Sequence, residues 1–186
     1  TISEPVEPLE ISPLLYSEAT PAQRQVLEAD YAVKPFTINT IKLERIFADK
    51  ILAAEFYYQR RMLFDAAKHL YDLTMMMQQD RIQALLSSPD ELVKMLAYKR
   101  REETERIGSD LAKKPFPEFQ LFRAIGVDAE LTSAFSKMQE IYVFSQDDVL
   151  SLEQLSVHMT ALDQTLLTLD EGLTMTSGPG PTQQML

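Results

Sequence analysis

A lysine inside an apolar helix pattern and three polar residues on the next helix are the side chains best placed for chemistry. Lys50 falls in the middle of the apolar face that residues 43–58 form when they are read at 100° per residue. Such a lysine must reach solvent, pair with an acid or lose its charge, because an unpaired buried ammonium is very costly. Asp65, His69 and Asp72 follow at i, i+4 and i+7, so they stack along one side of a second helix.

The two helices are separated by a short bend at residues 59–62, and helices joined in this way usually pack antiparallel. In such a hairpin Lys50 lies level with Asp72. One interpretation is a structural ion pair that sets the register of the two helices. The other is a charged site that opens into a cleft and binds an anion or a metal. His69 does not distinguish them, because surface and helix-cap roles are more common than catalysis for a single histidine.

A basic cluster in the middle of the chain is a second candidate binding surface. The net charge is −10, from 18 Lys and Arg against 28 Asp and Glu, but residues 42–114 hold 14 basic and 12 acidic side chains. Lys99, Arg100 and Arg101 lie in its densest part and are candidate nucleic-acid contacts. Three glutamates at residues 102–105 are interleaved with the cluster, so a solvated helix face is the alternative.

Periodicity and end signals predict a mainly α protein with a short strand remnant at its N-terminal end. Residues 36–41 alternate as a strand does, and residues 9–16 are a strand candidate interrupted by Pro13. The segments that start at Ser88 and Ser151 fit capping boxes. The expected helices are residues 21–30, 43–58, 63–78, 80–86, 89–107, 128–144 and 151–170, with a Pro-containing linker at 113–117.

Composition excludes several classes of protein. With 45% hydrophobic and 25% charged residues, the chain is not a disordered acidic tail. The absence of cysteine excludes disulfide scaffolds, cysteine zinc sites and thiol catalysis, and two histidines cannot form an all-histidine metal site. No run of about 18 apolar residues and no signal peptide is present, so we expect no membrane partner and a cytoplasmic location.

Residues 43–54 (LERIFADKILAA) and 68–73 (KHLYDL) carry a spaced motif. A lysine is followed by an alanine four residues later, by basic residues in the bend, and by a basic-x-x-x-Asp-Leu stretch on the next helix. This pattern resembles the AbiEii/AbiGii family of nucleotidyltransferase-like toxins of bacterial type IV toxin–antitoxin and abortive-infection systems. Many members carry Arg-Asp where this chain has Lys68-His69. The resemblance covers residues 36–169, and its positions here are Lys50, Ala54, Arg60 or Arg61, Lys68, Asp72 and Leu73.

The resemblance implies a nucleotidyltransferase that uses Mg²⁺ and a nucleoside triphosphate. Lys50 would neutralise triphosphate charge, and Asp72 would act as a base toward the acceptor hydroxyl or orient Lys50, so both are candidate catalytic residues. A cognate antitoxin and a tRNA acceptor are the implied partners. The candidate nucleotide or phosphate contacts are Arg60, Arg61, Lys68 and His69.

The chain lacks the Gly-Ser turn followed by Asp-x-Asp that holds the metal ions in such enzymes, and it begins with Thr1. We therefore expect a C-terminal portion of a longer protein, or a degenerate member, with no metal site and no activity of its own. Its helical bundle would follow the end of a nucleotidyltransferase-like sheet. The alternative is a non-catalytic helical interaction module in which Lys50 and Asp72 form a structural pair. The expected parts are residues 1–41 as terminal strands of a truncated nucleotidyltransferase-like domain, 42–175 as a helical C-terminal domain and 176–186 as a flexible tail.

Overall fold

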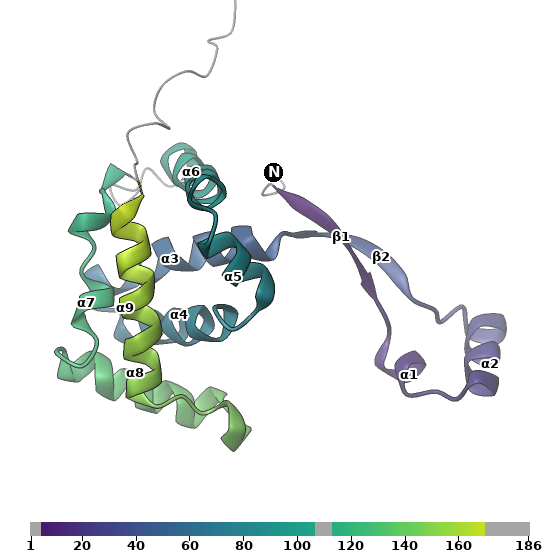
Figure 1. Cartoon of the computed structure of the whole chain (residues 1–186). Helices are drawn as coiled ribbons and strands as arrows, with labels where there is room; N and C mark the ends of the chain where they lie inside the picture. Colours follow the sequence, from purple (N-terminus) through teal and green to yellow (C-terminus); the bar gives the residue numbers. More distant parts are fainter. Residues whose placement is uncertain (1–4, 107–112, 170–186) are drawn as a thin grey trace, which may run out of the picture. The chain divides into compact units, whose positions relative to one another are not determined.

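The computed structural model of the protein describes residues 5–106 and 113–169 (Figure 1). The chain divides into two compact units, residues 1–42 and 43–186, which are described separately. The prediction of a mainly helical protein with a short strand pair is confirmed. The expected flexible tail lies outside the described residues. Within the described ranges no helix is long and apolar enough to cross a membrane.

The first unit is a two-stranded antiparallel sheet with two helices between its strands. The strands pair along their full length, starting with Val6 opposite Ile41. Thr20 begins the longer helix with a capping box, in which its hydroxyl accepts a hydrogen bond from the amide of Gln23. The elements are β1 (Val6–Ile11), α1 (Leu14–Ser17), α2 (Pro21–Tyr31) and β2 (Phe36–Ile41).

The predicted strand at residues 9–16 is wrong in its position, whereas the one at residues 36–41 is confirmed. β1 ends at Ile11, and Pro13 directly precedes the short helix α1. Proline has no amide hydrogen to donate to a strand ladder, and its fixed φ suits the start of a helix. Pro13 therefore separates a strand from a helix rather than interrupting one strand.

The first unit contains no buried side chain among its described residues. Leu9, Phe36 and Ile38 on the strands are 48%, 51% and 42% exposed. Each strand has one edge without a partner strand in the described part of the chain. A two-stranded sheet without a core is at best marginally stable in water, so this unit leaves apolar surface and backbone hydrogen-bonding groups available to further structure.

The second unit consists of packed helices, with α3 and α4 at its centre. α3 packs against α4, α5, α6 and α7, and α4 also contacts α8 and α9. The prediction for residues 80–86 is confirmed at both ends, and the other long helices end within a few residues of their predicted limits. The elements are α3 (Leu43–Gln59), α4 (Leu63–Met76), α5 (Asp80–Leu86), α6 (Pro89–Arg106), η2 (Phe116–Glu118), α7 (Leu121–Ala124), α8 (Ala129–Tyr142), η3 (Gln146–Asp148) and α9 (Leu152–Thr168).

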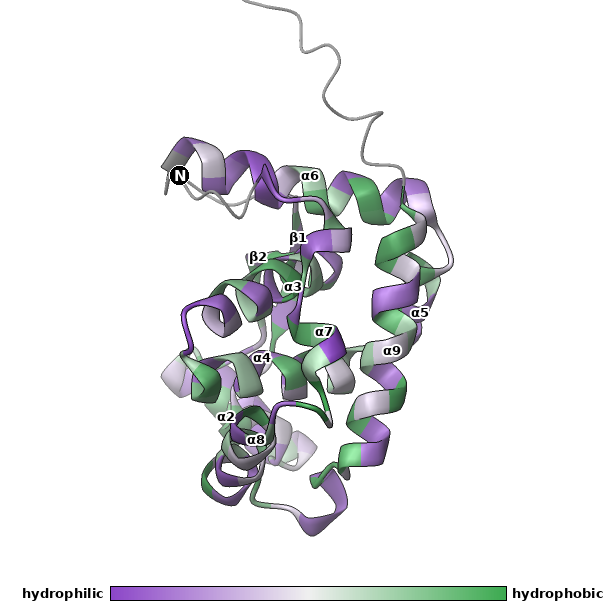
Figure 2. Ribbon diagram, turned by 90° about the vertical axis from the view of Figure 1, so that its left-hand side faces the viewer, coloured by the Kyte–Doolittle hydropathy of each residue, from purple (hydrophilic) through white to green (hydrophobic). Residues whose placement is uncertain are grey.

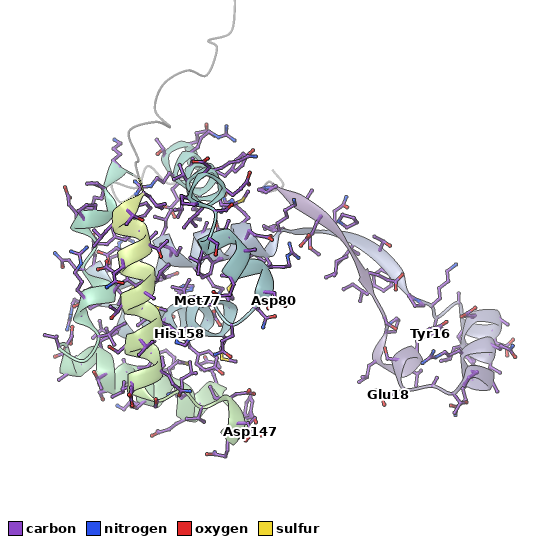
Figure 3. The ribbon with its side chains drawn as sticks, in the orientation of Figure 1. Tyr16, Glu18, Met77, Asp80, Asp147 and His158 are labelled. Carbon is purple, nitrogen blue, oxygen red and sulfur yellow. The ribbon has the colours of Figure 1, made fainter. Side chains whose placement is uncertain are left out.

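The core of the second unit is built from apolar stripes, and α9 gives the clearest case. Figure 2 shows green and purple residues alternating along this helix. Leu155, Met159, Leu162 and Leu166 recur at helical spacing, and each is at most 2% exposed. His158, labelled on α9 in Figure 3, lies outside this stripe, with its Nδ1 2.8 Å from the carbonyl oxygen of Gln154. α9 therefore packs through one face, and its histidine has a local partner.

The segment predicted as a linker at residues 113–117 is partly core, which corrects that prediction. Phe116 is 2% exposed and begins the turn η2, and α7 follows with Leu121 fully buried. The carboxylate of Glu55, itself fully buried on α3, accepts hydrogen bonds from the amides of Gln120 and Leu121 at 3.0 and 2.8 Å. A buried acid thus satisfies the backbone of this segment, which local sequence patterns do not reveal.

Candidate functional site

Lys50 and Asp72 form an ion pair between α3 and α4, as predicted. Their Nζ and Oδ2 atoms lie 2.5 Å apart. A second cross-helix pair lies further along, where the ring of Tyr57 stacks on that of His69. From the first pair to the second, the residue number increases on α3, from 50 to 57, and decreases on α4, from 72 to 69. The two helices are therefore antiparallel. The bend between them turns at Arg61, whose φ is 57°, a left-handed conformation that ends α3.

The Lys50–Asp72 pair is open to solvent. Its side chains are 24% and 42% exposed, respectively. Arg45 is much less exposed to solvent than Lys50. Its side chain is 1% exposed and pairs with Asp49 and with Glu102, the latter at 2.6 Å. Burial lowers the pKa of Arg45, and the charge of Glu102 opposes that change. Arg45 is therefore a buried cation in an ion pair, which the sequence patterns did not indicate, whereas the pair at Lys50 is open to solvent.

His69 lies beside this pair and is half-buried. Its ring stacks on Tyr57 with the ring centroids 5.4 Å apart and the planes 19° from parallel. Burial lowers the pKa of His69, and the charge of Lys50 lowers it further, while Asp72 and Asp65 act in the opposite direction. The imidazole is therefore neutral near pH 7. Its Nδ1 is buried without a hydrogen-bond partner.

Lys68 lies next to His69 in sequence but makes its own contacts. Its Nζ lies 3.1 Å from a carboxylate oxygen of Asp65, one turn earlier on α4. The same ammonium lies 5.0 and 5.1 Å from the ring centroids of Phe64 and Tyr142. The hydrogen bond that Lys68 donates to the Asp65 carboxylate raises the pKa of Lys68, so this side chain is positively charged at neutral pH. Lys68 thus adds a half-exposed cation to the neighbourhood of His69.

The two arginines of the bend lie apart from the pair. Both follow Gln59, the last residue of α3, which is nine residues beyond Lys50, or about 14 Å along the helix at 1.5 Å per residue. Arg61 is fixed by acidic partners of its own. It forms ion pairs with Asp128, at 2.7 Å, and with Glu130. Chiefly through Arg61, the pKa of Asp128 falls to about 2. The guanidinium of Arg60 lies 3.9 Å from the centroid of the Phe56 ring. Arg61 therefore links the bend after α3 to the start of α8, a role that the sequence did not suggest.

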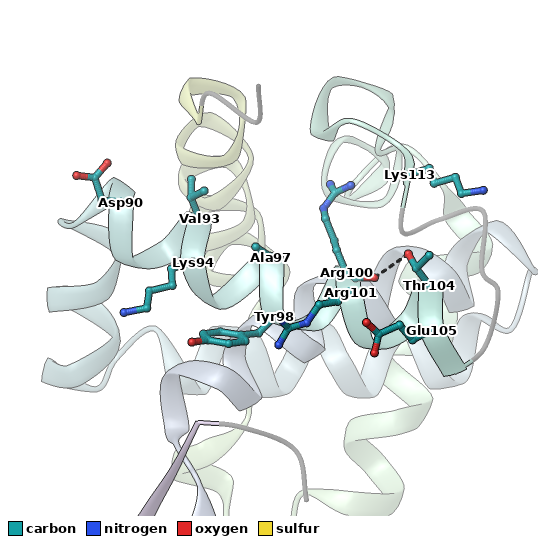
Figure 4. Close-up of a pocket in the computed structure, with 10 residues that line it drawn as sticks. All are labelled: Asp90, Val93, Lys94, Ala97, Tyr98, Arg100, Arg101, Thr104, Glu105 and Lys113. Atoms are coloured by element: carbon teal, nitrogen blue, oxygen red, sulfur yellow. Dashed lines mark hydrogen bonds between the residues drawn. The ribbon is translucent and has the colours of Figure 1, made fainter. Parts of the chain in front are cut away.

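A groove of about 730 Å³ runs along α6 (Figure 4). Arg100 and Arg101 line it, with the guanidinium of Arg101 5.5 Å from the ring centroid of Tyr98. Lys99 lies outside it and pairs with the nearly buried Glu103 at 3.4 Å. Two of the three predicted nucleic-acid contacts therefore share a surface. The lining residues are Asp90, Val93, Lys94, Ala97, Tyr98, Arg100, Arg101, Thr104, Glu105 and Lys113.

The described residues do not fit a magnesium site. No group of three or more His, Asp or Glu side chains that could hold a metal occurs among them. Asp72 is also neutralised by Lys50. Cationic and hydrogen-bonding groups that suit phosphate oxygens do gather here, in Lys50, Lys68 and His69. The chemistry of these side chains therefore suits an anion, whereas the described residues do not offer the set of oxygen ligands that Mg²⁺ requires.

Residues 1–165 match the model of a family described as nucleotidyl transferase AbiEii toxin, type IV TA system. No match was found among curated proteins or among solved structures. The matched range contains both helices of the Lys50–Asp72 pair and the sheet of the first unit. The chain belongs to the AbiEii family of nucleotidyltransferase toxins of type IV toxin–antitoxin systems.

Proposed function

We propose that this chain supplies the Lys50–Asp72 part of a nucleotidyl-transfer site, which moves a nucleotide from a nucleoside triphosphate to an acceptor hydroxyl. The observation that carries the proposal is the solvent-open ion pair between α3 and α4, in a chain of this family. A closed pair would favour the alternative, a non-catalytic helical interaction module. The 24% and 42% exposure of the two side chains favours a site that ligands can reach.

In the proposed reaction, the acceptor hydroxyl oxygen attacks the α-phosphorus of the triphosphate. The bond from that phosphorus to the bridging oxygen breaks, and pyrophosphate leaves. Asp72 takes the hydroxyl proton or, in the other role open to it, orients Lys50. The Lys50 ammonium offsets the negative charge that the phosphates bring, which matters most where solvent is partly excluded.

We propose that the rest of the nucleotidyltransferase domain completes the sheet of the first unit and brings the carboxylates that bind Mg²⁺. The exposed apolar residues on β1 and β2, and the open edge of each strand, support this. The intact mass of the product of the natural gene tests it. A mass above that of the 186 residues is expected, and a mass equal to theirs would overturn this part of the proposal.

We propose the α6 groove as the surface that holds the acceptor, with tRNA as the first acceptor to test. Lys94, Arg100, Arg101 and Lys113 line the groove and suit phosphates, and the ring of Tyr98 offers a face for base stacking. Titration of tRNA at several salt concentrations should give an affinity that falls as salt rises. Membership of the family also implies a cognate antitoxin as a partner.

Transfer of labelled nucleotide to tRNA by the full-length protein tests the catalytic roles. Lys50→Met and Asp72→Asn should each lower the rate by roughly a hundredfold or more, as expected for loss of charge stabilisation or of a general base. The control is Arg123→Met with Asp163→Asn, which breaks an inter-helix pair between α7 and α9. The control should keep its activity. Transfer retained by the Lys50→Met, Asp72→Asn double variant would remove both residues from the reaction.

A further inference from the structure

The orientation of the His69 ring carries an inference about how the site holds its ligand, and this inference rests on the proposed function. The buried nitrogen is Nδ1, and it has no partner in the described part of the chain. Nε2 has no hydrogen-bond partner in the described ranges either, yet it is not among the buried atoms that lack one, so it is the nitrogen that solvent reaches. The two ring nitrogens are therefore in different environments.

These environments determine where the single proton of the neutral ring lies. An N–H group buried without an acceptor loses its hydrogen bonds to water and gains nothing in return. A buried lone pair is the smaller loss, because unsatisfied acceptors are tolerated better than unsatisfied donors. We therefore assign the proton to Nε2. In this tautomer, His69 presents one N–H donor to solvent beside the Lys50–Asp72 pair.

The neighbours of His69 keep the ring neutral and fixed. Lys50 from α3 and Lys68 from α4 oppose a positive charge on the imidazole, while Asp65 and Asp72 favour it, and burial opposes it most. Protonation would also place a hydrogen on the buried Nδ1 without an acceptor. Tyr57 stacks on the ring and limits its rotation. The ring, and with it the Nε2–H donor, is thus held in place before a ligand binds.

We propose that His69 binds a phosphate oxygen of the nucleotide through its Nε2–H, as a neutral donor that acts beside the Lys50 ammonium. Such a donor orients the ligand without adding charge to a site that already holds two lysines and two acids. Asp72 would repel a phosphate that approaches Lys50 alone, and a donor next to the pair favours approach from the His69 side. His69 is therefore a binding residue that orients the triphosphate and takes no part in proton transfer.

NMR of the free protein tests the tautomer. The nitrogen chemical shifts of the His69 ring should show a protonated Nε2 and a bare Nδ1 near neutral pH, and His158→Gln separates the signals of the two histidines. A ring with its proton on Nδ1, or a charged ring at pH 7, would overturn the proposal. This measurement needs no substitution at His69.

Calorimetric binding of inorganic triphosphate tests the contact. Glutamine places its amide N–H near the position of Nε2, whereas asparagine places its amide near Nδ1. His69→Gln should retain the wild-type affinity within about twofold, and His69→Asn should weaken it about tenfold or more, as for one hydrogen bond to a charged acceptor. Circular dichroism checks that both variants fold, and His158→Asn is the control at the other histidine.

The outcomes separate this inference from the function on which it rests. Affinity lost in Lys50→Met but unchanged in His69→Asn would overturn the role of His69 and keep the anion site. Equal losses in His69→Gln and His69→Asn would also overturn it, because the donor at the Nε2 position would then not matter. No binding by the wild-type chain at millimolar triphosphate would overturn both proposals.

Discussion

Replacing Lys50 by Met and Asp72 by Asn, singly and together, measures how much the two charges stabilise the fold. Methionine keeps most of the apolar stem of the lysine, and asparagine keeps the shape of the carboxylate. The two side chains are 24% and 42% exposed, so water screens their attraction. The coupling energy between them should be about 0.2–1 kcal/mol, as for exposed pairs. A closed structural pair would instead cost about 3–5 kcal/mol when one partner is removed.

Urea denaturation of the wild-type chain and the three variants gives the coupling energy as a double-mutant cycle. Far-UV circular dichroism is the suitable signal, because the helices of the second unit dominate it. Thermal melts give a second reading, since 1 kcal/mol moves the melting temperature of a chain of this size by about 2–4 °C. The same cycle on Arg123 and Asp163, 44% and 14% exposed, serves as the control.

A coupling energy above about 3 kcal/mol at Lys50–Asp72 would refute this reasoning, because exposed pairs do not reach that value. It would show that the pair closes off from water in solution. The helical interaction module would then be the better account of this chain. A small coupling energy together with lost transfer would instead assign the two residues to chemistry rather than to stability.

Three further replacements probe contacts that position the helices. Asp128→Asn should lower the free energy of unfolding by about 1–2 kcal/mol at pH 7, after allowing for the half-exposed Arg61. The native pKa of this carboxyl, about 2, lies below its usual 3.8, so its stabilisation is present above about pH 4 and is lost as pH falls toward 2. Glu55→Gln should cost about 2–3 kcal/mol, because one carboxylate serves the amides of Gln120 and Leu121. Ser151→Ala should cost about 1 kcal/mol, because the hydroxyl caps α9.

For each replacement, one result would contradict the expected loss of stability. An Asp128→Asn variant as stable as the wild type at pH 7, or a difference that persists unchanged near pH 2, would show that the ion pair with Arg61 does not stabilise the fold. An unchanged urea midpoint in Glu55→Gln would show that the Glu55 carboxylate is solvated rather than hydrogen-bonded to the amides of Gln120 and Leu121. A Ser151→Thr variant keeps the capping hydroxyl and is the matched control for Ser151→Ala. Equal melting temperatures for these two variants would exclude a capping role.

The long helices could be predicted because their signals are local. Ser151 and Gln154 form the capping box expected from four consecutive residues. The apolar spacing of α9 likewise needs only its own sequence. The segment at residues 113–127 could not be read in this way. Phe116 and Leu121 enter a core whose other side is built from distant helices, and Glu55 holds their backbone from another element.

The candidate site was predictable in part. Lys50 could be matched with Asp72 because a short bend leaves two helices little choice but to pack antiparallel. The sequence did not show which of two cations on α3, Lys50 or Arg45, is buried. In the structure Arg45 is buried and Lys50 is partly exposed. Nor did the sequence assign Arg61, because Asp128 and Glu130 lie at the start of α8 and reach it only in the folded chain.

The sequence by itself determined which residues form helices and which charges interrupt apolar faces, because those depend on neighbours within a few positions. Tertiary structure alone decided which charged side chains are exposed to solvent. Lys50 lies at the edge of the α3–α4 contact and stays reachable, while Glu55, five residues later on α3, faces inward and caps a backbone turn. Five residues turn a helix by about 140°, so the packing of neighbouring helices decides which of the two charges is reachable and which is structural.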